Sequence, residues 1–207
     1  MKKLIAIVFG VCLAVSSFGQ GFVDARIEDR AGRNMSLDRA TWVMPTITYE
    51  HHEVHSGSHY CISITDTDLD TAETNGIVLI TTNSTKWVHM LFSADDTVAA
   101  TLSIYEGIIQ TNLGAAITPI NSDRNSTNLS DTKLYQGSTT VITNFGTVVK
   151  RTLIGTNNPL NRQGGGTRGE NEYILKQNTA YAILIEGNAD NGRANVGLCW
   201  YEHTNKE

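Results

Sequence analysis

The chain has 207 residues, a formal net charge of −5 and 18% charged residues. A length of this order suits one domain with a real core, or a sandwich plus an arm. The acidic balance lacks the positive surface that a phosphate backbone requires, so we expect no nucleic-acid partner. The charged fraction is below the roughly 25% of a typical globular domain, and threonine, asparagine and serine supply the polarity instead.

The first 19 residues have the three parts of a secretory signal. A cationic pair, Lys2-Lys3, precedes an apolar run at 4–15, and small residues end at Gly19. This pattern predicts cleavage before Gln20 and export from the cytoplasm. The apolar run is shorter than the about 20 residues that span a membrane, so we expect no stable membrane insertion after leader cleavage. The alternative is a buried N-terminal strand or helix that is never cleaved.

Two cysteines, Cys61 and Cys199, remain once the leader is removed. In an oxidising compartment they can form one disulfide. The alternative is a pair of buried free thiols that behave as small hydrophobic side chains. The sequence leaves this choice open.

Residues 20–46 form a separate segment in which acidic and basic residues alternate with few apolar anchors. Trp42 and Met44 are its candidate contacts, because aromatic residues and methionine are enriched at interface cores; the alternative places Trp42 in the core of the next domain. Ser36 can cap a short helix, and Pro45 marks the end of the segment. We therefore divide the chain into a signal peptide at 1–19, an N-terminal arm at 20–46 and a β-sandwich domain at 47–207.

From residue 47 on, short β-branched and aromatic runs recur between clusters of glycine, asparagine, aspartate and serine, which is typical of strands and turns. No stretch of the mature chain shows the sustained periodicity of a helix. About nine strands at this spacing predict an all-β fold, a single jelly-roll-like sandwich with an extended N-terminal arm. The predicted strands lie at 59–65, 76–82, 86–92, 99–105, 139–143, 147–154, 172–176, 180–186 and 196–201.

Two long polar connections interrupt this pattern, at 121–128 and 157–169. Loops of this length in a compact domain are usually functional or disordered. The second contains Gly164-Gly165-Gly166, but no predicted helix follows, so it makes a poor phosphate cradle. The alternative for both is a mobile linker between strands.

Four of the six histidines lie close together, at His51, His52, His55 and His59. In an extended segment three of them would share one face, because their spacing is even, and His203 can join them if the last strand pairs alongside. Neutral imidazoles are common metal ligands, and zinc or nickel suits them. The spacing matches no standard zinc pattern, however, and the alternative is a set of polar or partly buried structural histidines. We therefore assign no metal-binding residue.

Motifs that carry catalysis are missing from the chain, which has no Gly-x-Ser-x-Gly and no His-Glu-x-x-His. Asp66, Asp68 and Asp70 stand at every second position and can hold calcium weakly, but they lack the glycine and distal glutamate of an EF-hand loop. Exposed turn acids are the alternative. We assign no catalytic or cofactor-binding residue, expect no cofactor, and predict that the chain is not an enzyme.

Six segments, taken in chain order, carry a family resemblance. They are Tyr49–Tyr60, Thr85–Met90, Ile104–Gly107, Asn121 with Arg124–Ser126, Glu172–Tyr181, and Trp200–Thr204. In this order they resemble a group of tailed-bacteriophage and prophage virion proteins. The resemblance covers roughly residues 49–204. It implies a capsid-decorating or head-associated β-sandwich that contacts other virion subunits as a homo-oligomer, and it implies no catalytic residues.

The leader and the resemblance indicate different compartments. A capsid component assembles in the cytoplasm. Either this chain is not a decoration protein, or the leader does not function, or a phage-type domain serves as a bacterial surface or secreted protein. We therefore expect a virion or extracellular location. The alternative function is a secreted β-sandwich that binds glycans or cell surfaces, with Tyr105, Tyr135, Tyr173 and Trp200 as candidate stacking residues. Aromatic residues on strands more often belong to a core.

Overall fold

The computed structural model describes residues 27–28, 34–35, 49–155 and 172–204. The chain divides into two units, Met1–Ile47 and Thr48–Glu207. In the first unit, β1 (Ile27–Glu28) and β2 (Asn34–Met35) form an antiparallel pair. The expected leader, the expected helix from Ser36 and the anchors Trp42 and Met44 lie outside the described residues. Within the described ranges, no helix is long and apolar enough to cross a membrane.

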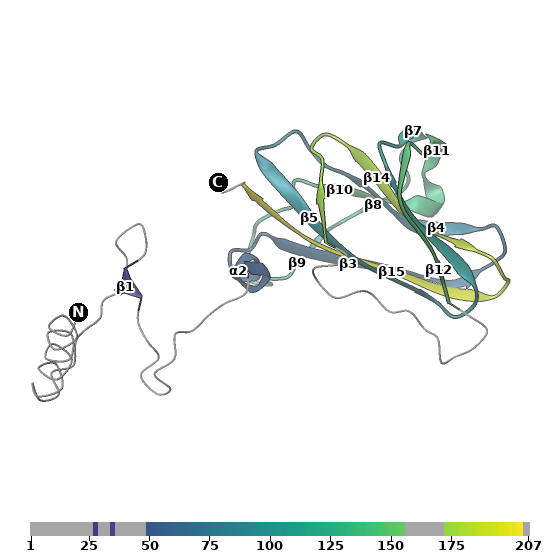
Figure 1. Cartoon of the computed structure of the whole chain (residues 1–207), viewed down its shortest axis with the longest axis horizontal. Coiled ribbons are helices and arrows are strands. Elements are labelled where there is room, and N and C mark those ends of the chain that lie inside the picture. The colour runs from purple at the N-terminus through teal and green to yellow at the C-terminus, as the bar shows by residue number, and fades with distance from the viewer. Residues whose placement is uncertain (1–26, 29–33, 36–48, 156–171, 205–207) are drawn as a thin grey trace, which may run out of the picture. The chain divides into compact units, whose positions relative to one another are not determined.

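Two antiparallel sheets make up the second unit and pack face to face as a β-sandwich (Figure 1). The larger sheet has six strands, in the order β12-β6-β14-β4-β10-β8. Its members are β4 (Thr74–Ile80), β6 (Ala100–Glu106), β8 (Ala116–Ile117), β10 (Lys133–Gln136), β12 (Thr147–Ile154) and β14 (Ala180–Gly187).

The smaller sheet has five strands, in the order β13-β5-β15-β3-β9. Its members are β3 (His59–Leu69), β5 (Lys86–Asp96), β9 (Ile120–Asn121), β13 (Tyr173–Leu175) and β15 (Gly192–Thr204). Three further elements complete the described part of this unit: helix α2 (Tyr49–His55), the two-stranded ribbon of β7 (Ile109–Asn112) and β11 (Val141–Asn144), and the 3-10 helix η1 (Gly137–Thr139).

Alternation of side chains explains why each long strand has one face in the core. In β5, Val88, Met90 and Phe92 are buried, whereas the residues between them are half-exposed. In β15, Val196 and Leu198 alternate with half-exposed residues in the same way. Successive side chains of a strand point to opposite faces. The buried set of each strand therefore meets the other sheet, and the remaining set forms the outer face.

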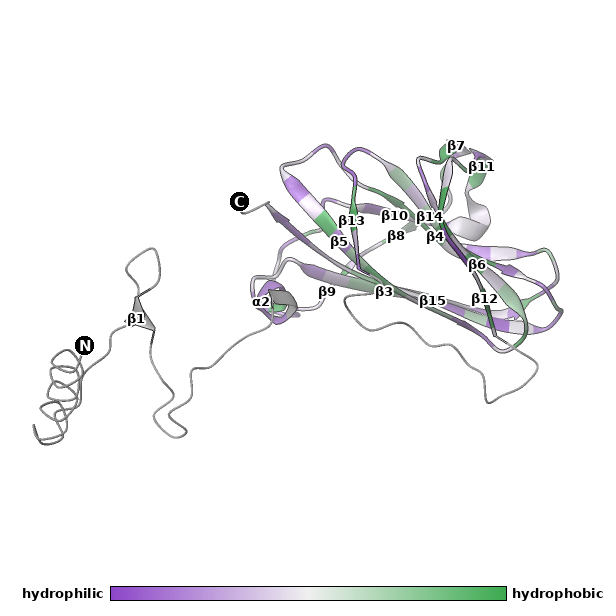
Figure 2. Ribbon diagram, in the orientation of Figure 1, coloured by the Kyte–Doolittle hydropathy of each residue, from purple (hydrophilic) through white to green (hydrophobic). Residues whose placement is uncertain are grey.

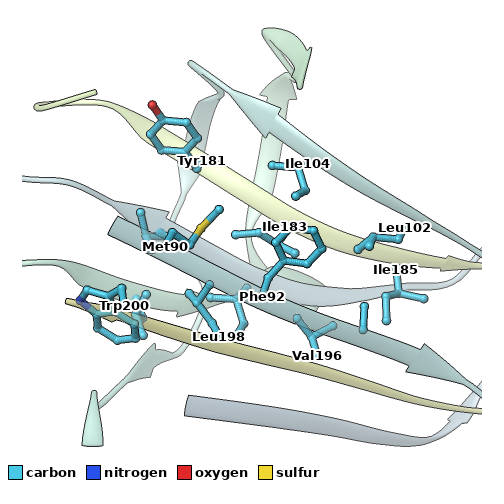
Figure 3. Packing of buried hydrophobic residues seen from close by; sticks show 14 of the residues in the cluster. Met90, Phe92, Leu102, Ile104, Tyr181, Ile183, Ile185, Val196, Leu198 and Trp200 are labelled. Carbon is cyan, nitrogen blue, oxygen red and sulfur yellow. The ribbon is translucent and has the colours of Figure 1, made fainter. Parts of the chain in front are cut away.

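The main core lies between the two sheets (Figure 3). Met90, Leu198 and Trp200 enter it from the five-stranded sheet, and Leu102 and Ile183 enter it from the six-stranded sheet. All five side chains are almost completely buried. Burial of an apolar side chain of this size contributes about 1.5–3 kcal/mol, so this interface is the main source of stability of the sandwich.

A smaller buried cluster lies on the outer face of the six-stranded sheet. Val78, Tyr105, Ala182 and Leu184 alternate with main-core residues along their strands, so they point away from the main core. Ile142 of the β7–β11 ribbon packs against this cluster, and Figure 2 shows apolar positions in the ribbon. The ribbon therefore covers part of this outer face.

Gly76 on β4 allows three elements to approach one another closely. Its φ is +153°, and a Cβ at this position would lie 2.1 Å from the carbonyl oxygen of Ile183 on β14. On the other side, a Cβ on Gly137 of η1 would lie 2.9 Å from the backbone of Gly76. Only a residue without a side chain fits this conformation and this space.

The structure confirms the predicted all-β sandwich, and strands occupy the predicted positions. The expected strand at 139–143 is a partial exception, because the end of η1 precedes β11 there. The sequence did not indicate helix α2 or the short strands β7, β8, β9 and β10. Each of these strands has four residues or fewer, which is too short for alternation to be recognised.

Candidate functional site

The outer face of the five-stranded sheet carries four polar and aromatic side chains that we call the His-Tyr-Glu cluster: His89, Glu172, Tyr201 and His203. β5 and β15 bring three of them together, because His89 is registered with Tyr201 and β15 continues to His203. Glu172 directly precedes β13, which pairs with β5 on its other side. Three segments that are far apart in the sequence therefore meet at this place.

Hydrogen bonds and ring contacts hold the cluster together. Nδ1 of His89 lies 3.0 Å from Oε1 of Glu172 and 3.1 Å from the hydroxyl oxygen of Tyr201. The Tyr201 hydroxyl donates to the same Glu172 oxygen. Nε2 of His89 lies 2.8 Å from Nε2 of His203. The rings of His89 and Tyr201 stack with centroids 4.6 Å apart, so the four side chains form one connected network.

A hollow of about 590 Å³ adjoins this cluster on the same face. Cys61 and Cys199 line it together with Leu91, Ser93 and Gly197. Leu91 is two residues beyond His89 on β5, so the hollow and the cluster share strands. Ser93 has a small side chain and Gly197 has none, so the space stays open.

Cys61 and Cys199 are registered partners on β3 and β15, with Cα atoms 4.1 Å apart, and they form a disulfide. Neighbouring antiparallel strands bring directly opposite residues to Cα separations of about 4.5–5.5 Å, which is close enough for a disulfide to form. The structure therefore decides between the two alternatives that the sequence left open, in favour of the disulfide.

The histidines of the 51–59 segment do not share one extended face, which corrects the expected arrangement. His51, His52 and His55 lie on helix α2, and only His59 lies on a strand, at the start of β3. The rings of His51 and His55 lie 4.6 Å apart, because residues four apart share a helix face. His59 instead contacts Ser122, with 2.6 Å between Nδ1 and the hydroxyl oxygen.

The side chain of Glu53 on helix α2 forms hydrogen bonds with the residues that lead to the start of β3. It is buried and accepts hydrogen bonds from the hydroxyls of Ser56 and Ser58, while Nδ1 of His52 lies 3.3 Å from its carboxylate. Burial by itself raises the pKa of this carboxyl. The hydrogen bonds from Ser58, His52 and Ser56 outweigh burial and hold the pKa below its usual value.

Asp66 and Asp68 lie on strand β3, which corrects the alternative of turn acids for these two, and only Asp70 follows the strand. Oδ1 of Asp66 accepts the backbone N–H of Asp68 at 3.1 Å, and Oδ1 of Asp70 accepts that of Asn191 at 3.0 Å. In the part of the chain that the structure describes, no three histidine, cysteine, aspartate or glutamate side chains lie close enough to hold a metal ion together.

The aromatic residues expected to stack on sugars do not form an exposed row. Trp200 is 0% exposed and its Nε1–H donates to Glu202, and Tyr105 is 9% exposed. Tyr135 and Tyr173 are half-buried. Trp200 and Tyr105 thus belong to the packed interior, which is the alternative that the sequence offered for aromatic residues on strands.

One of the two long polar connections is described, and its side chains organise it. Nδ2 of Asn121 donates to the carbonyls of Gly57 and Asn128, and Oδ1 accepts the N–H of Asp123. The 121–128 connection is therefore pinned to the end of helix α2. The connection at 157–169 lies outside the described residues.

The imidazole of His59 lies against the hydroxyl of Ser122, as a general base lies against a nucleophile in some enzymes. The backbone N–H of Ser122, however, donates to the carbonyl of His59, next to the pairing of β9 with β3. The contact thus belongs to the place where β9 pairs with β3. It does not test whether the chain is an enzyme, so the absence of enzyme activity stays a prediction.

Comparison with protein-family models, with curated proteins and with solved structures finds no match. The function has to be argued from the geometry of the sandwich.

Proposed function

We propose that this protein is a non-enzymatic structural subunit that assembles with copies of itself. It serves as a capsid-decorating or head-associated component of a phage virion, or as a subunit of a phage-derived extracellular assembly. The observation that carries the proposal is a pair of strand edges with opposite charge on opposite flanks of the sandwich. The strand order and an exposed apolar patch add support.

The strand order supports jelly-roll connectivity. Along the chain, β3, β4, β5 and β6 alternate between the five-stranded and the six-stranded sheet, and β12, β13, β14 and β15 alternate again. The resulting orders are β13-β5-β15-β3 and β12-β6-β14-β4, as expected for eight strands in two Greek keys. Jelly rolls occur in viral capsid proteins and in lectins. This analogy of fold favours a particle or binding role without deciding between them.

β12 provides the first edge. It pairs with β6 on one side, and the described residues place no strand on its other side. Lys150 and Arg151 stand at its centre, while Val148 and Leu153 are 48% and 72% exposed. A long edge strand with exposed apolar side chains is a template for pairing with another chain.

β3 provides the second edge. β9 pairs with Tyr60 and Cys61 only, so within the described ranges the stretch 62–69 has no neighbouring strand on that side. Asp66 and Asp68 lie in this stretch. β3 packs toward β4 in the opposite sheet, whereas β5 packs toward β12. The two edges therefore lie on opposite flanks.

Charge favours a contact between these two different edges. Two β12 strands would set basic residues side by side, and like charges opposite one another are destabilising. β12 of one copy beside β3 of another would instead set a basic residue, Lys150 on one face of β12 or Arg151 on the other, against Asp66 and Asp68, which share one face of β3. A head-to-tail contact of this kind closes into a ring or extends into a filament.

An exposed apolar patch adjoins the β12 edge and can extend the contact. Phe145 lies against Tyr105, with ring centroids 4.8 Å apart, and Val148 is registered with the same tyrosine. Ile109 lies opposite Asn144 in the β7–β11 ribbon. Ile109 and Phe145 are 57% and 45% exposed. Contiguous exposed apolar residues mark sites of protein contact.

The disulfide supports a location outside the reducing cytoplasm, because such bonds persist in secreted proteins and on particle surfaces. This agrees with the expected leader and with the expected virion or extracellular location.

Charge reversal at the two edges tests the proposal. The full chain is expected to associate, as measured by light scattering after size exclusion and by sedimentation over a range of concentrations. Arg151→Glu and Asp68→Arg should each weaken association at least tenfold, since each places like charges together. The double variant restores opposite charges and should recover association.

Glu186→Arg is the matched control, because Glu186 is an exposed acid on the central strand β14. It should leave association unchanged. A full chain that stays monomeric at all concentrations would contradict the assembly proposal. Association that survives both single variants would leave the assembly in place but remove the edge pairing.

A further inference from the structure

We propose that the disulfide of Cys61 and Cys199 is a site of thiol exchange, at which the thiolate of a small thiol compound attacks Cys199 and Cys61 is the leaving sulfur. The attack forms a bond between the incoming sulfur and Sγ of Cys199. It breaks the Sγ–Sγ bond, and Cys61 leaves as a thiolate with the electron pair of that bond. One disulfide replaces another, so no oxidant is consumed. The site does not rest on the proposed assembly.

The disulfide can be reached from the outer face of the five-stranded sheet. Both cysteines are half-buried and line the hollow of about 590 Å³ on this face. The row of residues beside them, Ser63, Gly197 and Ser93, is in register across the three strands and occupies little space. A small thiol can therefore reach the sulfur atoms while the sandwich stays folded. Exposed disulfides are the ones that exchange readily.

A hydrogen bond distinguishes the two sulfur atoms. The hydroxyl of Ser122 donates to Sγ of Cys61 across 3.8 Å. The described residues supply no corresponding donor to Sγ of Cys199. A leaving sulfur gains negative charge, and a hydrogen-bond donor stabilises that charge. A thiolate that is better stabilised leaves faster, so exchange should release Cys61.

The hydroxyl of Ser122 is held beside Cys61 by two contacts with His59. Its oxygen lies 2.6 Å from Nδ1 of His59, and the backbone N–H of Ser122 donates to the carbonyl of His59 at 2.9 Å. These contacts fix both the backbone and the side chain of Ser122 where β9 pairs with β3. His59 is therefore a positioning residue, and Ser122 is the group that touches the leaving sulfur.

Access to the sulfur atoms favours the same direction of attack. Side chains two residues apart share one face of a strand. On the side of the hollow, the neighbour of Cys199 on β15 is thus Gly197, and the neighbour of Cys61 on β3 is Ser63. Gly197 has no side chain, so Cys199 is the more open of the two.

Reaction of the full oxidised chain with reduced glutathione identifies the sulfur that is attacked. The reaction is stopped early with iodoacetamide, and the peptides are analysed by mass spectrometry. Glutathione should be found on Cys199 and the alkyl group on Cys61. Equal amounts of glutathione on the two cysteines, or an excess on Cys61, would overturn the proposal.

The same reaction in low concentrations of urea shows whether the folded chain reacts. The rate of the first attack should change little below the unfolding transition, because the disulfide is already accessible. A rate that rises in proportion to the unfolded fraction would show that exchange requires unfolding, which contradicts the proposal.

Variants of Ser122 test the role of its hydroxyl. Ser122→Ala should slow the attack about three- to tenfold, as expected for the loss of one hydrogen bond, and should reduce the excess of glutathione on Cys199. Ser122→Thr keeps a hydroxyl and should keep the rate. Ser63→Ala, the matched control on the same face, should change neither rate nor product. A rate and a product ratio that Ser122→Ala leaves unchanged, or rates lowered equally by both Ser122 variants, overturn the proposal.

Discussion

Glu202 shows how one buried carboxylate orders a loop. Its side chain accepts the Nε1–H of Trp200 at 3.1 Å and the hydroxyl of Ser130 at 2.5 Å. It also accepts the backbone N–H groups of Asp131 and Thr132, at 3.0 and 3.1 Å. All four partners donate, so a carboxylate, which only accepts, suits the position. The loop before β10 is thereby tied to the last strand.

Glu202→Gln should lower the free energy of unfolding by about 2–4 kcal/mol. The amide would turn two N–H groups toward N–H donors and leave them unsatisfied in a buried place. Urea unfolding followed by tryptophan fluorescence measures the change. Glu186→Gln, at an exposed position, should stay within about 0.5 kcal/mol of the unaltered chain. A loss of under 1 kcal/mol in Glu202→Gln would contradict this account.

Glu106 gives the protein a dependence on pH. Nζ of Lys176 lies 2.6 Å from its carboxylate, and the hydroxyl of Tyr181 donates to it at 3.0 Å. The Lys176 hydrogen bond, aided by Tyr181 and against the effect of burial, holds the pKa of Glu106 below its usual value of 4.5. A carboxyl with a lower pKa in the folded state contributes stability above its unfolded pKa and loses this contribution as the pH falls through the folded pKa.

We therefore expect stability to fall from about pH 5 downward, and Glu106→Gln to remove part of this dependence. The variant should also lose about 1 kcal/mol at pH 7, as expected for hydrogen bonds to a charged group near the surface. Urea unfolding at pH 7, 5, 4 and 3 measures both effects. Glu53 has a lowered pKa as well, so the stability of the Glu106→Gln variant should still depend on pH to some extent. Equal slopes in the two chains would rule out the role of Glu106.

At the scale of elements, a disulfide joins β3 to β15 through residues that are 138 positions apart in the chain. The two strands already pair over most of the length of β3, so the disulfide acts mainly on the unfolded chain. Closing a loop of this length restricts the unfolded ensemble by about 5 kcal/mol in the entropy model. The bond therefore matters more to overall stability than to the shape of the sheet.

Replacing both cysteines, Cys61→Ala with Cys199→Ala, should lower the free energy of unfolding by about 3–5 kcal/mol. Guanidinium unfolding of the oxidised chain and of the double variant gives the difference. The unaltered chain under reducing conditions should behave like the variant. If reduction left its midpoint unchanged, the disulfide would not restrict the unfolded state as described.

Local patterns predicted the long strands well and the short elements poorly. β4, β5, β6 and β12 have clear runs of β-branched and apolar residues, because their faces in the core need them. Helix α2 has only seven residues, and the hydrogen bonds of the buried Glu53 go to His52, Ser56 and Ser58 nearby in the chain, so the segment is too short to show a helical period. The histidines on it were consequently placed on a strand by sequence reasoning.

At the scale of the whole molecule, the expected leader and the proposed assembly make a joint prediction. We expect the native protein to start at Gln20 and to form particles larger than one chain. Intact-mass analysis of the native material, together with its particle size, measures both. A soluble monomer that starts at Gln20 would contradict assembly, and an uncleaved Met1 in purified virions would contradict export.

The sequence by itself determined the all-β character and the faces of the long strands, because the two-residue period is a local property. The tertiary structure alone decided which strands are neighbours, and hence that Cys61 meets Cys199 and that His89 meets His203. The pairing register depends on contacts over the whole chain, which no local pattern contains. For the same reason, only the folded sandwich reveals the opposed charges of the β12 and β3 edges.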